Sequence, residues 1–544
     1  HTSSSVTGVQ TCALPISCVI FEDEHLLVVN KPPGWNTHAP APFAGEGIYD
    51  WLHHREPRWA NLAILHRLDK ETSGVLVFGK TPLANKSLTQ QFEQRTVSKR
   101  YELITDRPVE RDEFTIETDI ERQGERYVVR PLQPGGTRAE THFRVLRRNR
   151  DQTWLEARPV TGRTHQIRVH AAHAGCPISG DELYGGTPGA PRLGLHAAEL
   201  SCRHPASGAE TVFTAPNSMF CSAASLLRRA FINPAETTCC RLRHGAADER
   251  PDFYAEQLGE WLLVQGRLNL SDRDDEGAIR DVARESNLKG AFFKQLDREV
   301  RRKQPSDVAP LALFVEDAPQ DFSVMENGLH FHVSMKEGYS YGLFLDQRDN
   351  RRRLLTGHIA AGFPLCAPSA ACRVLNTFAY TCGFSVAAAK AGHHTTSLDL
   401  SKKYLEWGKR NFALNGLDPA AHDFIYGDVF DWLRRLAKKG RLFDAVLLDP
   451  PTFSQSKESG VFRAEKDYGK LVALALPLLA PDGILFASTN CAAIPPEDFL
   501  ATVTDAIRHA GRRVAQQHYV PQPPDFPITR EEPAYLKTVW LRVS

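Results

Sequence analysis

Alternating strand and helix patterns near the C-terminus constrain the fold of this 544-residue sequence more than any other feature. Helical patterns separate three apolar, β-rich runs, at 373–380, 395–401 and 445–451. Parallel strands need a crossover connection, which is usually a helix, so this order predicts a parallel sheet with helices on both faces. The C-terminal part of the chain should therefore be a Rossmann-like, doubly wound α/β domain.

The rest of the chain divides into further domains. At roughly 100–200 residues per domain, the length allows three or four of them. Short strand-like runs joined by loops fill the N-terminal part, which predicts a β-rich α+β domain. The opening HTSSSVTGVQTCALPI has no periodicity and resembles translated adapter sequence. We predict an artefact or disordered tail over 1–17, then domains over 18–220 (β-rich α+β), 221–340 (small α+β) and 341–544 (doubly wound α/β).

Composition excludes several classes of protein. No run approaches the roughly 20 apolar residues of a membrane helix, and no signal segment opens the chain, so we expect a cytoplasmic protein. The 11 cysteines are scattered and contain no C-x-x-C, which predicts neither a metal site nor disulfides. A net charge of +1 argues neither for nor against a nucleic-acid partner.

Polar residues follow the predicted parallel strands, where doubly wound sheets bind their ligands. Gly383 lets the backbone turn close to a ligand after the first strand, and Asp399 can bind both hydroxyls of a ribose after the second. Asp428 is placed to face an adenine edge, and Asp449 opens a Pro-Pro turn. The absence of G-x-G-x-x-G disfavours a dinucleotide enzyme.

The stretch ILHRLDKETSG, residues 64–74, places Asp69 among basic side chains. Alone, such a pattern is as often a solvated surface salt bridge as a catalytic site. Two further segments, SKRYELIT at 98–105 and GRTHQIRVH at 162–170, carry polar residues that a β-rich scaffold can bring to the same cleft.

Several segments together, in order, resemble the RluA-type RNA pseudouridine synthases over about residues 18–220. They are NKPPGWNTH, HRLDKETSG, SKRYELI, GRTHQIRVH, ISGDELYG and LHAAELSCRHPASG. The resemblance implies an essential aspartate at Asp69, a functional tyrosine at Tyr101 and a functional arginine at Arg168. It also implies an isomerase that needs no cofactor.

The chemistry of that reaction explains the residue types. A carboxylate can attack the anomeric carbon of the uridine or stabilise its cationic character, and a fixed cation such as Arg168 favours the ionised carboxylate. Tyr101 can stack on the base and relay a proton. His66 and Arg67 are candidates to fill the gap left by a flipped base.

The remaining polar residues of these segments have structural alternatives. We predict Arg163 and His165 as RNA contacts, although His165 is also a candidate for a purely structural role. Gly180, Asp181 and Tyr184 are expected to shape a turn rather than to take part in chemistry.

Residues 225–544 resemble the RlmI/RlmK group of 23S ribosomal RNA methyltransferases, through GLFLDQRDNR, FAYTCGFS, LDPPTF and PITREEPAYLK. The group's N-terminal RNA-binding PUA module has no counterpart here. The resemblance implies a class I domain that binds S-adenosylmethionine. The predicted cofactor-binding residues are Phe378, Tyr380, Thr381, Gly383, Asp399, Asp428, Asp346 and Arg348.

The methylated atom decides the role of Cys491. Cytosine C5 requires a thiolate to add to C6 first, and Cys491 follows a predicted strand where the cytosine-modifying members carry a cysteine. A guanine ring nitrogen would need no nucleophile, and Cys491 would then be a buried core residue. Asp449 would orient the base or handle a proton. Cys382, where the group usually has glycine, is expected to crowd the methionine part of the cofactor.

The hypothesis is therefore a bifunctional RNA-modifying enzyme that acts on RNA, with 23S ribosomal RNA and cytosine C5 preferred, without metal or membrane. The alternatives are methylation of guanine N7, or a C-terminal half that only binds RNA.

Overall fold

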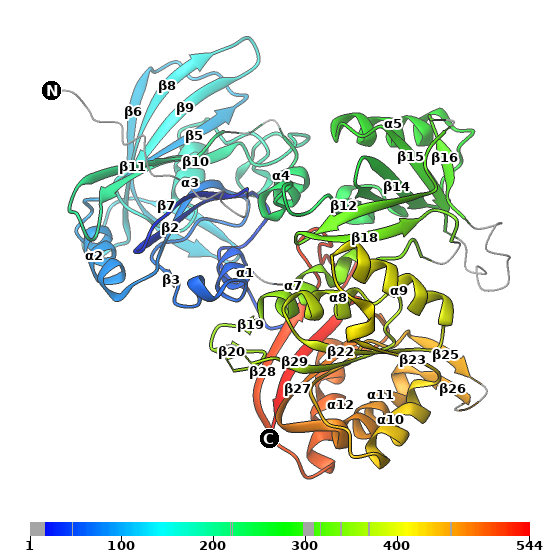
Figure 1. Ribbon diagram of the computed structural model, residues 1–544. Coiled ribbons are helices and arrows are strands. Elements are labelled where there is room, and N and C mark those ends of the chain that lie inside the picture. Colours follow the sequence, from blue (N-terminus) through cyan, green and yellow to red (C-terminus); the bar gives the residue numbers. More distant parts are fainter. Residues whose placement is uncertain are drawn as a thin grey trace. The chain divides into compact units, whose positions relative to one another are not determined.

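The computed structural model describes residues 17–45, 47–217, 219, 221–296, 309–315, 317–337, 340–367, 370–456, 458 and 460–544 (Figure 1). The tail predicted over 1–17 lies almost wholly outside the described residues. The chain forms two compact units. The first comprises 1–39, 47–50 and 61–233, and the second comprises 40–46, 51–60 and 234–544. Residues 221–233 thus belong to the first unit, while the finer domain boundaries stay predictions.

One large mixed sheet forms the first unit, with strand order β1-β2-β4-β10-β5-β9-β8-β6-β7; β3 pairs with β4, and β11 with β10. The strands are β1 (Val19–Glu22), β2 (Leu26–Lys31), β3 (Ala63–Ile64), β4 (Ser73–Gly79), β5 (Ser98–Thr105), β6 (Glu113–Gln123), β7 (Arg126–Arg130), β8 (Arg138–Arg148), β9 (Thr153–Pro159), β10 (Leu195–Arg203) and β11 (Glu210–Thr214). The helices include α2 (Pro82–Glu93), α3 (Gln166–His173) and α4 (Ala223–Phe231), and α1 (Ile48–His53) contains residues of both units. This is the β-rich α+β domain that the sequence predicts.

Local sequence explains the first hairpin and the first long helix of this unit. The Asp23 side chain accepts hydrogen bonds from the backbone N–H groups of His25 and Leu26, which closes the turn between β1 and β2. Thr81 caps α2 by accepting from the Ala84 N–H, and a proline occupies the first turn of the helix. Leu88 on α2 then packs with apolar residues of β2 and β4.

The second unit begins with a small sheet of order β12-β13-β14-β15-β16. Helix α5 (Arg273–Glu285) connects the parallel pair β14 and β15. The elements are β12 (Cys239–His244), β13 (Phe253–Leu258), β14 (Trp261–Gly266), β15 (Gly290–Gln295) and β16 (Leu311–Leu313). A hairpin of β17 (Asp321–Glu326) and β18 (Leu329–Ser334) follows. This arrangement agrees with the predicted small α+β part.

A seven-stranded sheet of order β23-β22-β21-β24-β27-β29-β28 completes the second unit. Its strands are β21 (Arg373–Thr377), β22 (His394–Asp399), β23 (Asp423–Tyr426), β24 (Phe443–Leu448), β27 (Leu479–Thr489), β28 (Val514–Pro521) and β29 (Lys537–Val543). The first five in this spatial order pair in parallel, and β29 pairs antiparallel with β27 and β28. The predicted doubly wound α/β sheet is confirmed.

Alternating burial along β24 shows why helices cover both faces. Ala445 and Leu447 join the core under α7 (Arg348–Thr356), α8 (Gly383–Lys390) and α9 (Lys402–Leu414). Val446 and Leu448 join the opposite core under α10 (Val429–Lys438), α11 (Ala464–Ala475) and α12 (Pro496–His509). A strand buried on both faces is a continuous apolar run, as the sequence AVLL has here. Two short hairpins accompany this sheet: β19 (His358–Ala360) with β20 (Phe363–Pro364) precedes it in sequence, and β25 (Phe453–Ser456) with β26 (Gly460–Arg463) lies between β24 and β27.

Candidate active sites

Asp69 lies in the loop between β3 and β4, and its side chain is 26% exposed. A turn in which the Thr72 N–H donates to the Asp69 carbonyl shapes the loop. Gly74 closes it at a φ of +119°, and a Cβ at that position would lie 2.2 Å from the carbonyl oxygen of Ala197 on β10. The glycine at the end of the HRLDKETSG segment therefore lets β4 approach β10 closely.

Arg168, on the first turn of α3, faces Asp69. One of its terminal nitrogens lies 3.8 Å from Asp69 Oδ2. Its Nε and other terminal nitrogen donate to the two carboxylate oxygens of buried Asp181, at 2.7 and 2.8 Å. Burial works to lower the pKa of Arg168, but the hydrogen bonds and charge of Asp181 raise it above its ordinary value. A fixed cation therefore faces Asp69.

Three aromatic side chains surround this pair. Burial, together with the charge of Asp69, raises the pKa of the Tyr101 hydroxyl on β5. The Tyr184 hydroxyl lies 2.8 Å from His165 Nδ1, and His165 Nε2 lies 4.0 Å from Asp69 Oδ2. Burial lowers the pKa of His165, although the charge of Asp69 opposes the effect. Asp181 and Tyr184, which the sequence assigns to a turn, thus belong to the site.

The other predicted substrate contacts lie in different settings. His66 Nε2 accepts a hydrogen bond from the Val77 N–H, and its ring centroid lies 5.0 Å from that of Phe92. Burial lowers the pKa of His66 to about 3, so the ring is neutral. Arg67 and Arg163 are exposed. His66 therefore supports β4. Arg67 is at the surface, and the exposed Arg163 donates through its Nε to the Arg138 carbonyl at 3.2 Å.

A second site is a cavity of about 620 Å³ in the other unit. It lies where β21, β22 and β24 end, the edge at which a doubly wound sheet binds ligands. Its walls include five of the eight predicted cofactor residues, namely Asp346, Phe378, Tyr380, Asp399 and Asp428. Further walls come from Phe344, Gln347, Tyr404, Phe430, Asp449, Pro450, Phe462 and Asn490.

Asp399 is fixed at the end of β22. Its Oδ2 accepts from the Tyr380 N–H and its Oδ1 from the Ser401 N–H, both at 2.8 Å. Burial raises its pKa above the ordinary value despite these hydrogen bonds. Asp428 caps α10 by accepting from the Asp431 N–H. The Asp399 carboxylate keeps further acceptor capacity for a ligand in the cavity.

The turn after β21 is tightly wound. Phe378, Tyr380 and Cys382 have φ values of 54°, 50° and 62°, in the left-handed region. Thr381 donates to the Gly342 carbonyl and Gly383 starts α8, so these two predicted cofactor residues shape the turn and are not among the cavity walls. Arg348 is also not a wall, because it forms a buried pair with Asp525 at 2.7 Å.

Cys382 packs away from the cavity. A Cβ at Gly408 of α9 would lie 2.4 Å from its Sγ, so the thiol fills the space that this glycine leaves. Cys382 is fully buried and does not belong to the cavity walls. The expected crowding of a cofactor by Cys382 stays a prediction, and in this structure the side chain packs against α9.

Asp449 and Asp346 form an acidic end of the cavity. Burial raises the pKa of Asp449 to about 6, against a hydrogen bond from Ser488. Gln347 Nε2 lies 3.3 Å from both Asp449 oxygens. Burial also raises the pKa of Asp346, whose Oδ2 accepts from the Tyr535 hydroxyl at 3.0 Å.

Cys491, the predicted nucleophile, directly follows Asn490, which lines the cavity. Its side chain is only 3% exposed and belongs to the core cluster of α10–α12. Its Sγ lies 3.6 Å from Glu465 Oε1. The thiol is thus close to the cavity in sequence but is not one of its walls.

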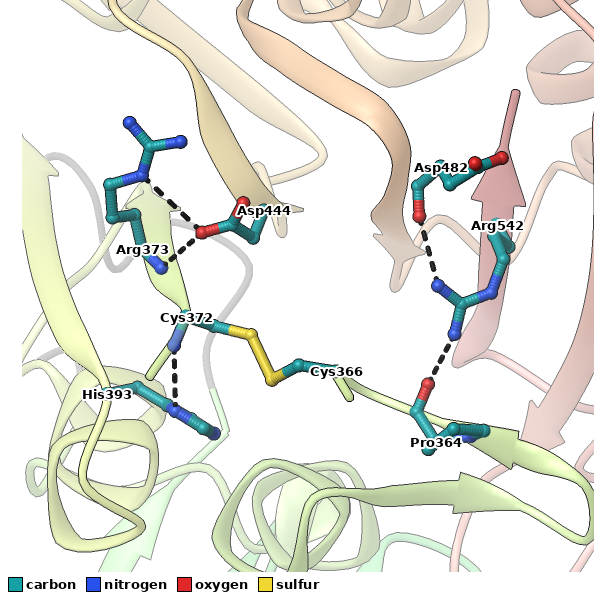
Figure 2. Close-up of a disulfide and its surroundings, with 8 residues drawn as sticks. All are labelled: Pro364, Cys366, Cys372, Arg373, His393, Asp444, Asp482 and Arg542. Carbon is teal, nitrogen blue, oxygen red and sulfur yellow. Dashed lines mark hydrogen bonds and ion pairs between the residues drawn. A yellow bond between two sulfur atoms is a disulfide. The ribbon is translucent and has the colours of Figure 1, made fainter. Parts of the chain in front are cut away.

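The prediction of no disulfides is wrong. Cys366 and Cys372 are joined by a disulfide at the start of β21, the end of the strand opposite to the cavity (Figure 2). His393 Nδ1 accepts from the Cys372 N–H at 3.2 Å. The six-residue spacing carries no recognisable sequence signature. With His393, these cysteines form the one group among the described residues whose atoms could hold a metal, and the disulfide occupies both sulfurs.

Among the described residues, no helix has the length and apolarity of a membrane span.

Comparisons with known proteins match a different family model to each unit. A family model described as RNA pseudouridylate synthase matches residues 25–173, and one described as S-adenosylmethionine-dependent methyltransferase matches residues 293–542. The chain is 35% identical to ribosomal large subunit pseudouridine synthase C of Vibrio cholerae over 211 residues, 37% of this chain and 65% of that protein.

Relatives of the second unit are named for the same ribosomal subunit. Ribosomal RNA large subunit methyltransferase K of Neisseria meningitidis is 40% identical over 186 residues, 34% of this chain and 49% of that protein, so the chain spans about half of its length. Ribosomal RNA large subunit methyltransferase I of Klebsiella pneumoniae is 31% identical over 306 residues, 56% of this chain and 73% of that protein. With this coverage, the chain belongs to the large subunit methyltransferase I family of S-adenosylmethionine-dependent methyltransferases, and its residues 25–173 match the model of the RNA pseudouridylate synthases.

Proposed function

We propose that this chain is a bifunctional RNA-modifying enzyme. The first unit isomerises uridine to pseudouridine, and the second transfers a methyl group from S-adenosylmethionine to an RNA base. The observation that carries the proposal is the pairing of Asp69 with the buried, Asp181-held guanidinium of Arg168. The relatives are named for the large ribosomal subunit, which supports its 23S RNA as the substrate.

In the isomerisation, Asp69 attacks the anomeric carbon or stabilises the positive charge that develops there. Arg168 faces the Asp69 carboxylate at 3.8 Å and orients it, and Asp181 prevents the guanidinium from turning away. Tyr101 has a raised pKa, so it acts as a stacking ring and a protonated hydrogen-bond donor rather than as a base.

In the methyl transfer, the cavity of the second unit fits the cofactor. Bound S-adenosylmethionine supplies an electrophilic methyl group. Asp399 is placed to accept hydrogen bonds from ribose hydroxyls, and Asp428 lies where an adenine edge would be read. Asp449, at the acidic end, orients the acceptor base or takes a proton from it.

The acceptor atom has two candidates. Cytosine C5 requires the Cys491 thiolate to reach C6, and the position of Cys491 beside the cavity-lining Asn490 supports this choice. A guanine ring nitrogen needs no thiolate, and the deep burial of Cys491 favours that second candidate.

The test uses the full chain and unmodified 23S ribosomal RNA transcript, with and without S-adenosylmethionine, followed by nucleoside mass spectrometry. Pseudouridine in both samples and a methylated base only with the cofactor would support the proposal. 5-Methylcytidine would assign the nucleophile to Cys491, and 7-methylguanosine would assign that cysteine to the core. The proposal would be contradicted if neither pseudouridine nor a methylated base formed on 23S ribosomal RNA or on transfer RNA.

A further inference from the structure

Arg192 in the first unit is a buried cation without a protein partner among the described residues. It lies just before β10 and is 7% exposed. All three guanidinium nitrogens are buried, and none donates a hydrogen bond to a residue that the structure describes. An unpaired buried charge costs several kcal/mol, so folded proteins almost always pair such groups. Among the described residues, the side chain therefore has unused donors that an anionic ligand could accept from.

The guanidinium borders a cavity of about 130 Å³, distinct from both active sites. Other walls are Asn30, Lys31, Ser73, His196 and Arg229. Since a water molecule takes up about 30 Å³, the cavity has room for a small polyatomic ion. No aspartate or glutamate is among its walls.

The remaining buried polar walls already have partners. Lys31 Nζ donates to the carbonyls of Pro32, Trp35 and Lys70, at 2.9, 2.7 and 3.0 Å. His196 lies between Ser73 Oγ at 2.8 Å and the Ala215 carbonyl at 3.2 Å. Arg192 is thus the buried wall with free donors, while the Lys31 ammonium is already held by three carbonyls. Burial lowers the pKa of Lys31 to about 7 and that of His196 to about 4, and the positive charge of Arg192 lowers both pKa values further.

We propose that this cavity binds a phosphate group held by the Arg192 guanidinium, and that its binding stabilises the loop carrying Asp69. A guanidinium presents a planar fork of donors that matches two oxygens of a phosphate. Arg192 and Arg229, with no carboxylate among the cavity walls, favour a multiply charged ion over a monovalent carboxylate. The loop is affected because Lys31 holds the carbonyl of Lys70, the residue after Asp69.

Free inorganic phosphate and an RNA backbone phosphate share this chemistry. The first measurement is equilibrium dialysis of the full chain with radiolabelled inorganic phosphate. Arg192→Met should weaken binding at least tenfold, because it keeps the side-chain length and removes the donors. The phosphate affinity of Arg192→Lys should lie between those of the unmodified chain and Arg192→Met. Arg130→Met, which removes an exposed arginine paired with Glu121 in the same unit, should bind phosphate as the unmodified chain does.

Thermal unfolding gives a second test, because Arg192→Met should lose phosphate binding without losing stability in phosphate-free buffer. In phosphate-free buffer Arg192→Met should unfold at the same temperature as the unmodified chain or higher, because it removes an unpaired buried charge. Added phosphate should raise the unfolding midpoint of the unmodified chain only. Phosphate should also slow hydrogen exchange of the amides from Lys70 to Gly74. If Arg192→Met does not fold, the same comparison is made with Arg192→Lys.

An RNA arm identifies the source of the phosphate. If RNA displaces the labelled phosphate, or if Arg192→Met lowers the salt dependence of RNA binding by about one phosphate contact, the group comes from the RNA backbone. If the labelled phosphate stays bound in the presence of RNA, it is a free ion. The direct phosphate measurement does not depend on either enzymatic activity. The proposal is overturned if Arg192→Met leaves both phosphate binding and the salt dependence of RNA binding unchanged.

Discussion

The two active sites place their carboxylates in opposite electrostatic settings. Asp69 is a quarter exposed and faces a guanidinium at 3.8 Å and a histidine at 4.0 Å. Asp449 and Asp346 lie together at the end of a cavity, and burial raises the pKa of both. A carboxylate that attacks carbon has to be ionised, whereas one that orients a base or handles a proton works near its pKa. The setting of Asp69 thus suits attack on carbon, and the setting of Asp449 suits handling of a proton.

Removing the carboxylate of the first site should have the largest effect. Asp69→Asn keeps the size of the side chain and removes the nucleophile, so pseudouridine formation should fall by about 10³-fold or more. The check is a tritium-release or mass-spectrometric assay under single-turnover conditions. A fall of less than tenfold in a folded variant would show that Asp69 is not the attacking group.

Changing the cation that faces Asp69 should have the next largest effect. Arg168→Met should lower the isomerisation rate by about 10²-fold, as for loss of one fixed electrostatic contact. Asp181→Asn should cost about tenfold, because one amide oxygen still accepts from Arg168. Single-turnover rates measure both. If Asp181→Asn were as damaging as Arg168→Met, Asp181 would have a direct role rather than a positioning one.

The next prediction concerns the pH dependence of methyl transfer at the second site. Asp449 has a pKa of about 6, above the 3.8 of an ordinary aspartate, so methyl transfer that needs its carboxylate should rise as the pH increases through about 6. Asp449→Asn should remove that rise. Because the pKa is raised, the folded state holds the proton more tightly than the unfolded state does. The contribution of Asp449 to the free energy of unfolding should therefore fall as the pH rises from about 4 to 6.

The pH profile of methyl transfer at saturating cofactor, measured for both proteins, is the check on Asp449. The same inflection in Asp449→Asn would assign it to another group, of which Asp346 is the first candidate.

The smallest effect concerns the turn beside the cofactor cavity. Gly408→Ala should destabilise the chain by about 1–3 kcal/mol through overpacking against the Cys382 thiol. The change should be tolerated in a Cys382→Gly background, and Cys382→Gly alone should alter cofactor affinity less than about threefold, since the thiol does not line the cavity. Thermal unfolding and titration calorimetry measure the two effects. Tenfold tighter cofactor binding in Cys382→Gly would show that the thiol does crowd the cofactor.

Sequence patterns predicted the elements of the molecule better than its long-range pairings. The AVLL run predicts β24 because burial on both faces imposes a continuous apolar pattern. Asp69 and Arg168 were found together because both lie in recognisable segments. Asp181 was missed, because a Gly-Asp turn gives no sign that its carboxylate meets a guanidinium 13 residues earlier. A buried arginine needs an anion, and that requirement is the signal that would have found it.

Other differences have the same origin. His66 belongs to a segment that predicts a ligand contact, yet its ring nitrogen pairs with the backbone of β4. The disulfide between Cys366 and Cys372 depends on how the chain returns before β21, and no local pattern encodes it (Figure 2). The direction of the Cys382 side chain depends on Gly408 of a later helix.

Two separate, independent sites are the central claim, and one crossed measurement tests it. Asp69→Asn and Asp399→Ala, each as the full folded chain, are given the same 23S ribosomal RNA transcript and S-adenosylmethionine, and both products are quantified by nucleoside mass spectrometry. The expected result is that Asp69→Asn loses pseudouridine and keeps the methylated base, while Asp399→Ala does the reverse. Loss of both products in either folded variant would contradict the claim.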